Sequence, residues 1–190
     1  IYQGDFLLIT GPNGGGKTSL LRTILRLQSP TKGRISFFRQ GEPVSSLDMG
    51  YLPQKNSIDS RFPITVEEVV ASGLMGNTQK GNTKFDSKKE IDEMLDLMGI
   101  TALRNKPIGV LSGGQLQRSL FGRALISKPE MLILDEPASY IDRQFGNRMF
   151  EILRDLSSNG TTIMMVSHEI EPFITLSNRN LYINHILGDR

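Results

Sequence analysis

The chain has 190 residues, the length of a single domain. Its 22 basic and 20 acidic residues leave a net charge of +2, which excludes a basic nucleic-acid-binding arm and an acidic tail. Hydrophobic residues reach 38%, enough for a packed core, and the lack of cysteine excludes disulfides, cysteine nucleophiles and thiolate metal sites. Glycine is the one excess, because its 19 residues exceed the average usage of roughly 7%.

No apolar run approaches the roughly 20 residues that span a bilayer, since the longest, such as 131–134 and 163–166, are strand-sized. The amino terminus also lacks the basic region and apolar stretch of a secretory signal. Because the chain starts with Ile1 rather than Met, we expect it to begin inside a longer protein. The default expectation is a soluble domain inside the cell.

The first fifty or so residues predict a strand, a helix and two further strands. Residues 6–9 are wholly apolar and precede Thr-Gly, which is typical of a strand buried on both faces of a parallel sheet. Apolar residues at helical spacing predict a helix over 18–27. Short strands are expected at 34–39 and 49–52, on either side of a turn-rich stretch at 40–48.

The middle of the chain predicts an insert made of helices. Two pairs have capping-box spacing: Thr65 with Glu68, and Ser87 with Glu90. Each pair precedes apolar residues at helical spacing, and Gly99 stands where the second helix would end. The polar stretch 76–86 between the two helices predicts a surface loop.

Strands and helices alternate again after the insert. Residues 131–134 predict a buried strand, Asp142 can cap a long helix that ends before Gly160, and residues 161–166 predict another strand. A short helix near Pro172 and a last strand near 181–186 complete the chain. This alternation predicts an α/β fold, with a parallel sheet covered by helices on both faces.

The sequence Gly11-Pro12-Asn13-Gly14-Gly15-Gly16-Lys17-Thr18 matches the phosphate-binding motif G-x-x-x-x-G-K-[ST] between a strand and a helix. Its glycines let backbone N–H groups face phosphate oxygens, and the helix that follows adds its positive end. Lys17 can neutralise the β- and γ-phosphates, and the Thr18 hydroxyl can ligate Mg²⁺. A glycine-rich turn with an incidental lysine is the less favoured alternative.

Two acids follow the strand at 131–134, and they are the expected partners of this motif. Adjacent residues at a strand end point in different directions, so the two carboxylates can take different tasks. Asp135 can hold the Mg²⁺ shell, and Glu136 can orient and deprotonate the attacking water. Solvated acids at a strand end are common, so the roles predicted for this pair depend on the presence of the phosphate-binding motif.

The sequence Leu111-Ser112-Gly113-Gly114-Gln115 precedes another helix and predicts a second anion site. Ser112 can cap the helix, while two glycines leave its first N–H groups exposed. The alternative is an ordinary helix cap without a ligand. This second site has no lysine and no acid close in sequence, which makes sense if it closes over a nucleotide held by another subunit.

Together these motifs resemble the nucleotide-binding domain of ABC ATPases over essentially the whole chain. The elements stand in the family's order: the Walker A loop at 11–18, the Q-loop glutamine Gln54, LSGGQ at 111–115, Walker B with Asp135 and Glu136, the D-loop aspartate Asp142, and the switch histidine His168. The resemblance implies a P-loop NTPase (RecA-like) core with a mainly parallel sheet. It also implies a helical subdomain over about 56–128, with the core at 1–55 and 129–190.

The resemblance further implies ATP and Mg²⁺ as ligands and a head-to-tail homodimer that sandwiches ATP. Ser112, Gly113, Gly114, Gln115 and Asp142 would then take part in nucleotide binding across the dimer. Gln54 would sense Mg²⁺ as part of the catalytic set, and His168 would hydrogen-bond the γ-phosphate. Two departures from the family stand out. Tyr140 occupies the D-loop position where many relatives have alanine. The aromatic residue that stacks on adenine is expected to be missing upstream, because Tyr2 lies too close to the loop in the sequence.

Three hypotheses remain open for the process that ATP hydrolysis would drive. A DNA-repair ATPase would need a coiled-coil arm between Gln54 and Leu111, and a translation factor would carry two Walker A motifs. An ABC transporter subunit fits best, held at the cytoplasmic face of the membrane by separate integral membrane permease subunits. Residues 51–59 and 62–66 resemble zinc, manganese and iron uptake ATPases, which implies metal ion import, with a non-metal substrate as the alternative. With two histidines and no cysteine, the chain itself is not expected to bind the transported metal.

Overall fold

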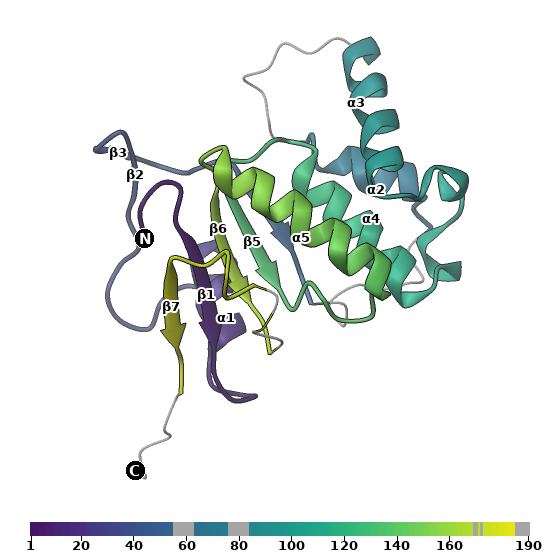
Figure 1. Ribbon diagram of the computed structural model, residues 1–190. Coiled ribbons are helices and arrows are strands. Elements are labelled where there is room, and N and C mark those ends of the chain that lie inside the picture. The colour runs from purple at the N-terminus through teal and green to yellow at the C-terminus, as the bar shows by residue number, and fades with distance from the viewer. Residues whose placement is uncertain (55–62, 76–83, 169–170, 172, 185–190) are drawn as a thin grey trace.

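The computed structural model describes residues 1–54, 63–75, 84–168, 171 and 173–184. The strands and helices follow one another along the chain as in Figure 1: β1 (Phe6–Thr10), α1 (Lys17–Ile24), β2 (Phe37–Arg39), β3 (Glu42–Val44), β4 (Met49–Leu52), α2 (Val66–Ser72), α3 (Lys84–Leu97), α4 (Gly113–Leu125), β5 (Met131–Asp135), α5 (Arg143–Ser158), β6 (Thr162–Val166) and β7 (Arg179–Tyr182). Two short 3₁₀ turns, Thr101–Leu103 and Ile108–Val110, lead into α4.

The main sheet has five parallel strands in the order β4-β5-β6-β1-β7. The strands β2 and β3 form a separate antiparallel hairpin. The expectation of a mainly parallel sheet in an α/β fold is therefore confirmed. Because every strand of the main sheet runs the same way, the segments after β1, β4, β5 and β6 leave from one edge.

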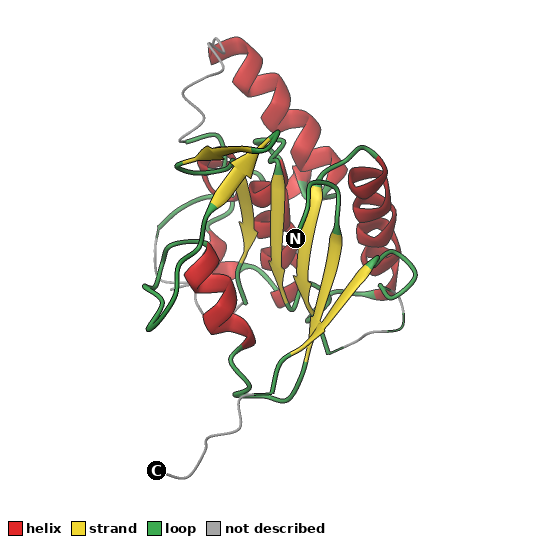
Figure 2. Cartoon of the chain, turned by 90° about the vertical axis from the view of Figure 1, so that its left-hand side faces the viewer, coloured by secondary structure: helices red, strands yellow, loops and turns green. Residues whose placement is uncertain are grey.

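Helices cover both faces of this sheet, as Figures 1 and 2 show. Side chains alternate along each strand, so Met131 and Ile133 face one side, and Leu132 and Leu134 face the other. Leu21 of α1 packs against the first set. The second set meets the apolar stripe of α5, formed by Phe145, Met149 and Leu153.

The middle helices continue the core on the α5 side. Helix α4 packs against β4 and α2, and α2 also contacts α3. The predicted capping box at Thr65 and Glu68 is present: Glu68 donates its backbone N–H to the Thr65 hydroxyl, and the Glu68 carboxylate accepts from the Thr65 backbone N–H. One apolar cluster runs from the sheet into α2, α3 and α4, so the subdomain boundaries stay a prediction.

Several element boundaries differ from the expected ones. Helix α1 ends at Ile24 rather than at 27, because Arg26 has φ +58° and Leu27 donates to the Arg22 carbonyl, which closes the helix. Strand β3 lies inside the stretch expected to be turns. It forms because it pairs with β2, a partner that local composition does not reveal.

The later elements also show differences. Helix α3 begins at Lys84, so Ser87 lies within the helix and is not its cap, while Gly99, with φ +65°, ends the helix as predicted. The last strand is Arg179–Tyr182, earlier than predicted, because it pairs with β1 from Leu7 to Thr10. Residues 173–176 are turns rather than a helix. Pro172 and His185 lie outside the described residues.

Candidate active site

The carboxyl ends of four neighbouring strands surround one polar cavity of about 390 Å³. Residues from the segments after β1, β4, β5 and β6 line it: Asn13, Gly14, Gly15, Gly16, Lys17, Thr18, Ser19, Gln54, Asp135, Glu136, Val166 and His168. The parallel sheet thus brings together the phosphate loop, the two acids, the glutamine and the histidine singled out in the sequence. Ser19 and Val166 are the lining residues that the motifs did not indicate.

Lys17 lies across the mouth of the phosphate loop with its side chain largely buried. Its Nζ donates to the Gly11 carbonyl at 2.8 Å and to the Pro12 carbonyl at 2.9 Å. Gly11 and Pro12 do not line the cavity, and they act through these two carbonyls. Helix α1 begins at Lys17, after Gly16 in the left-handed region, so its positive end faces the cavity.

Gly11 is required by a close approach of the backbone after β7. A Cβ atom at Gly11 would lie 1.9 Å from the Ile183 carbonyl oxygen. Ile183 is held there because its N–H donates to the Thr10 carbonyl at 2.8 Å. The carboxyl-terminal segment therefore forms a wall of the phosphate loop, a contact between distant residues that no local sequence motif indicates.

Asp135 ends β5 and is 1% exposed. Burial raises the pKa of its carboxyl group, and a hydrogen bond with the Thr18 hydroxyl opposes this effect. Within the described residues, Asp135 Oδ2 has no hydrogen-bond partner. An unpartnered carboxylate oxygen next to a hydroxyl fits Mg²⁺, which binds to one or two protein oxygens and completes its shell with phosphate and water.

Glu136 follows immediately and faces His168. Its Oε1 lies 3.2 Å from His168 Nε2, and its Oε2 accepts from the His168 backbone N–H at 3.4 Å. The Glu136 backbone has φ +55° and donates its own N–H to the Val166 carbonyl at 2.9 Å. Burial raises the pKa of the Glu136 carboxyl group, and the neighbouring His168 lowers it in part. A carboxylate with a raised pKa is suited to accept a proton near neutral pH.

The second predicted anion site forms a separate cavity of about 500 Å³ at the start of α4. Ser112 caps the helix, since its hydroxyl accepts from the Gln115 N–H, and the Gln115 side chain accepts from the Ser112 N–H. The lining includes Ser112, Gly113, Gly114, Gln115, Tyr140 and Asp142. This cavity shares no lining residue with the first one, so the two predicted phosphate sites lie apart in one copy of the described chain.

Asp142 is bound to two helices. Its Oδ1 accepts from the Phe145 N–H at 2.9 Å, which caps α5, and its Oδ2 pairs with Arg118 of α4. The bond from the Phe145 N–H is the main reason why the Asp142 pKa is lowered. Arg118 was not indicated by the motifs. The signal that could have found it is its position one helical turn after Gln115, on the side of α4 that holds the cap.

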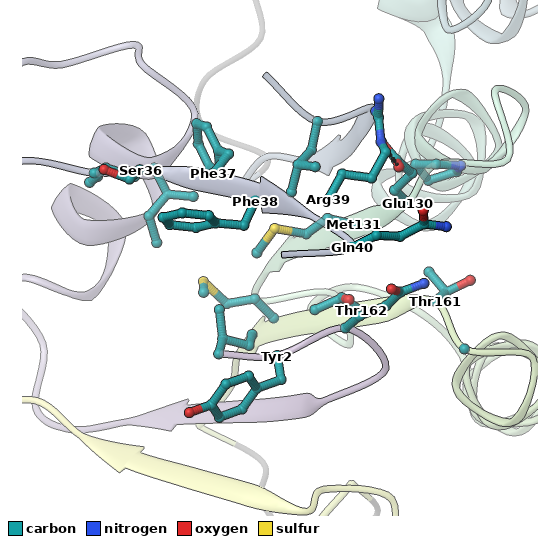
Figure 3. A pocket seen from close by; sticks show the side chains of 18 of the residues that line it. Tyr2, Ser36, Phe37, Phe38, Arg39, Gln40, Glu130, Met131, Thr161 and Thr162 are labelled. Carbon is teal, nitrogen blue, oxygen red and sulfur yellow. Dashed lines mark hydrogen bonds and ion pairs between the residues drawn. The ribbon is translucent and has the colours of Figure 1, made fainter. Parts of the chain in front are cut away.

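Tyr2 lies at the other end of the sheet. It precedes β1, stacks against Arg179 at 4.9 Å, and lines a cavity of about 540 Å³ at the amino ends of the strands (Figure 3). Phe37 and Phe38 lie on the far side of this cavity, and Arg39 pairs with Glu130 at 2.6 Å beside it. Tyr2 is therefore separated from the phosphate loop by the length of β1.

Comparison with known proteins identifies a matching family and similar relatives. The family model for ABC transporters matches residues 1–139. A probable metal transport system ATP-binding protein of Chlamydia pneumoniae is 40% identical over 98% of this chain and 77% of its own length. The zinc uptake system ATP-binding protein ZurA of Listeria monocytogenes is 37% identical over 99% of this chain and 73% of its own length.

The fold is also that of solved ATP-binding cassettes. A dimeric cassette in a post-hydrolysis state, bound to ADP and Pi, superposes with a TM-score of 0.82 at 26% identity. The superposition covers 97% of this chain and 83% of the other. In the part of the chain that the structure describes, no helix is long and apolar enough to cross a membrane.

Proposed function

The chain belongs to the ABC transporter family, and we propose that it is the ATP-hydrolysing subunit of an importer for a divalent metal ion. The single observation that carries the ATPase function is the cavity in which Lys17, Asp135, Glu136 and His168 meet. The assignment of a metal ion as the transported solute rests on two relatives, one named for metal transport and one for zinc uptake.

We propose that the polyphosphate of ATP lies along the phosphate loop and the first turn of α1. Lys17 would then exchange its two carbonyl partners for β- and γ-phosphate oxygens. Thr18 and Asp135 would hold Mg²⁺, which supplies positive charge to the phosphates when it is bound. Glu136 would accept a proton from the water that attacks the γ-phosphorus, while the bond to the β-phosphate oxygen breaks and ADP leaves.

His168 and Gln54 complete the proposed catalytic set. The bond from His168 to Glu136 fixes the carboxylate on the side of the cavity where the γ-phosphate would end. Gln54 follows β4 and reaches the same cavity, where its amide can orient water or contact the Mg²⁺ shell. Both residues would therefore act at the γ-phosphate end of the nucleotide.

The separation of the two phosphate sites supports a head-to-tail homodimer. Ser112 and Gly114 lie in a different cavity from Lys17, so one chain cannot close both sites on the same ATP. A second copy, turned by a two-fold rotation, would bring its Ser112 over the first copy's loop and the reverse. ATP would then be sandwiched twice at one interface.

Membrane-embedded partner chains would provide the pathway for the metal. The described residues contain no group of three or more histidine and acidic side chains able to hold a metal ion. We propose that the chain supplies energy at the cytoplasmic face of the membrane and that the selectivity for the metal belongs to the membrane subunits. A non-metal solute remains the alternative cargo.

The test uses the transporter purified with its membrane subunits and reconstituted in liposomes. We expect ATP-dependent uptake of Zn²⁺ or Mn²⁺ that stops when this chain carries Glu136→Gln. Uptake of a non-metal solute alone would contradict the metal assignment. A complex that hydrolyses no ATP under any condition would contradict the ATPase itself.

A further inference from the structure

Strand β7 forms an edge of the main sheet and leads the chain toward the phosphate loop (Figure 1). All four of its residues are exposed, so burial of side chains does not hold the strand in place. Its backbone pairs with β1 from Leu7 to Thr10. An edge strand with little buried surface is prone to local opening, so the contacts at its two ends matter for its position.

At the start of β7, the buried carboxylate of Asp5 gathers three donors. Asp5 is 7% exposed. Its Oδ2 accepts from Arg179 Nε at 2.6 Å and from the Tyr2 N–H at 2.7 Å. Its Oδ1 accepts from Asn178 Nδ2 at 3.3 Å. A buried carboxylate is costly unless such donors replace water, so Asp5 favours the one position of β7 that supplies them.

Further contacts make this cluster specific for the register of β7 on β1. The Asn178 Oδ1 accepts from the Phe6 N–H at 2.9 Å, and the Asn178 N–H donates to the Phe6 carbonyl at 3.2 Å. The Arg179 guanidinium pairs with Asp5 and also stacks on Tyr2, which an ammonium group cannot do as well. A slip of β7 by one residue would separate Asp5 from these donors, so the cluster fixes the register.

The register decides where Ile183, directly after β7, meets the phosphate loop. The Ile183 N–H donates to the Thr10 carbonyl at 2.8 Å, and its side chain packs against the apolar cluster on the α1 side of the sheet. Its carbonyl oxygen would lie 1.9 Å from a Cβ atom at Gly11 and 2.9 Å from one at Gly15. The Ile183 backbone therefore occupies the space that these two glycines leave beside the loop.

We propose that Asp5 and Arg179 are positioning residues for the phosphate loop, because they hold β7 in the register that brings Ile183 against it. The proposal rests on the proposed function, since the loop must bind the phosphates of ATP. When β7 opens, the glycine-rich loop loses its wall and can leave the conformation that binds phosphate. Only molecules with β7 closed then bind ATP tightly, so the measured affinity falls with the closed fraction.

Arg179→Ala tests this role through ATP affinity and turnover. We expect its Kd for ATP with Mg²⁺, measured by isothermal titration, to rise about three- to tenfold as the closed fraction falls. Its kcat at saturating ATP should stay within about twofold of wild type, because bound ATP restores the closed strand and Glu136 lies on another strand end. Arg179→Lys should recover part of the affinity, since it keeps the charge.

Ile183→Pro tests the other end of β7. Proline has no N–H, so this variant loses the bond to the Thr10 carbonyl while the phosphate loop and the Asp5 cluster keep their residues. Its Kd for ATP should also rise. The matched control is Arg39→Ala, because Arg39 is as exposed as Arg179, at 46%, and pairs with Glu130 at the same 2.6 Å, but lies on the β2-β3 hairpin. Its ATP affinity should be that of wild type.

Hydrogen exchange of the wild-type protein needs no variant and therefore decides the question even if Arg179→Ala does not fold. The Asn178 N–H lies at the end of β7 away from the phosphate loop, so ATP should slow its exchange only if it favours the closed strand. Unchanged exchange at saturating ATP would overturn the proposal. Wild-type affinity in Arg179→Ala and Ile183→Pro, or an equal loss in Arg39→Ala, would also overturn it. A wild-type protein that binds no ATP would instead refute the proposed function.

Discussion

The Glu136 carboxylate and the His168 imidazole face each other, with Oε1 3.2 Å from Nε2. They come from segments that follow the adjacent strands β5 and β6, whose register pairs Asp135 with Val166. The sheet therefore places the proposed base beside a group that can orient it. The decrease of kcat on the acid side of its pH profile should therefore depend on the interaction between Glu136 and His168.

Replacing His168 by alanine should shift the acid side of the pH profile of kcat. Burial raises the Glu136 pKa, and His168 lowers it in part, so removing the imidazole leaves the raising effect less opposed. Glu136 works in its ionised form, and we expect the half-maximal point of kcat on the acid side to move to higher pH. A profile measured from pH 5 to 9 would show it. A shift to lower pH would mean that His168 does not favour the ionised carboxylate.

Glu136→Gln should separate nucleotide binding from hydrolysis. The amide keeps the size of the side chain but cannot take a proton, so kcat should fall by about 10²–10⁴-fold, the usual contribution of a general base. ATP binding should persist. Because ATP is not hydrolysed, the dimer should accumulate, and light scattering can detect it. Nearly normal turnover would remove Glu136 from this role, and an ATP-loaded monomer at high concentration would count against the dimer.

Lys17→Ala should abolish tight ATP binding, because the variant removes the only charge-bearing side chain of the phosphate loop. Isothermal titration with ATP and Mg²⁺ measures this loss. Lys32→Ala is the matched control, since Lys32 is exposed in a different loop, and its affinity should be that of wild type. Equal affinity in Lys17→Ala would contradict the assignment of the loop.

Asp135→Asn should stabilise the nucleotide-free protein above neutral pH. The folded pKa of Asp135 is raised by burial, so the carboxyl group favours folding at pH values below its unfolded pKa and loses that contribution as the pH rises through the folded pKa. The neutral amide escapes this loss. We expect a gain of roughly 1–3 kcal/mol in unfolding free energy at pH 8 with EDTA, the usual cost of an unsatisfied buried polar group.

The gain should shrink as the pH falls and the wild-type carboxyl group becomes protonated. The same variant should lose most of the stabilisation that ATP with Mg²⁺ gives to the wild type, because its amide is a poorer Mg²⁺ ligand. Denaturant melts at several pH values measure both effects. A variant less stable than wild type at pH 8 would contradict the idea that the buried carboxylate is unsatisfied.

Local sequence was sufficient for the parts of the site that local geometry builds. The phosphate loop follows from glycines and a lysine at fixed spacing, and the caps at Thr65 and Ser112 follow from bonds within one helical turn. Where a local pattern was compatible with more than one structure, the prediction made from it was wrong. The Ser87 pair resembled a cap, yet the helix extends past it to Lys84.

Contacts between distant residues were decided only by the tertiary structure. The strand order places β7 beside β1, so that Ile183 closes against Gly11. The pairing of Arg118 with Asp142 joins two helices, and the bond between Glu136 and His168 joins the ends of two strands. Spacing along the chain carries no information on such pairs, because they form only when packing brings separate elements together.

The motifs and their order therefore determined from sequence alone that this chain is an ABC-type ATP-binding domain. They also predicted the phosphate loop, the two acids and a second site, where the cap at Ser112 is present. What the fold added is that the residues of the two predicted phosphate sites lie in separate cavities and that Asp142 joins α4 to α5 beside the second one. The physical reason is that each motif is built by contacts between residues close together in the chain. The relative position of the two sites depends instead on how β5, α4 and α5 pack against one another.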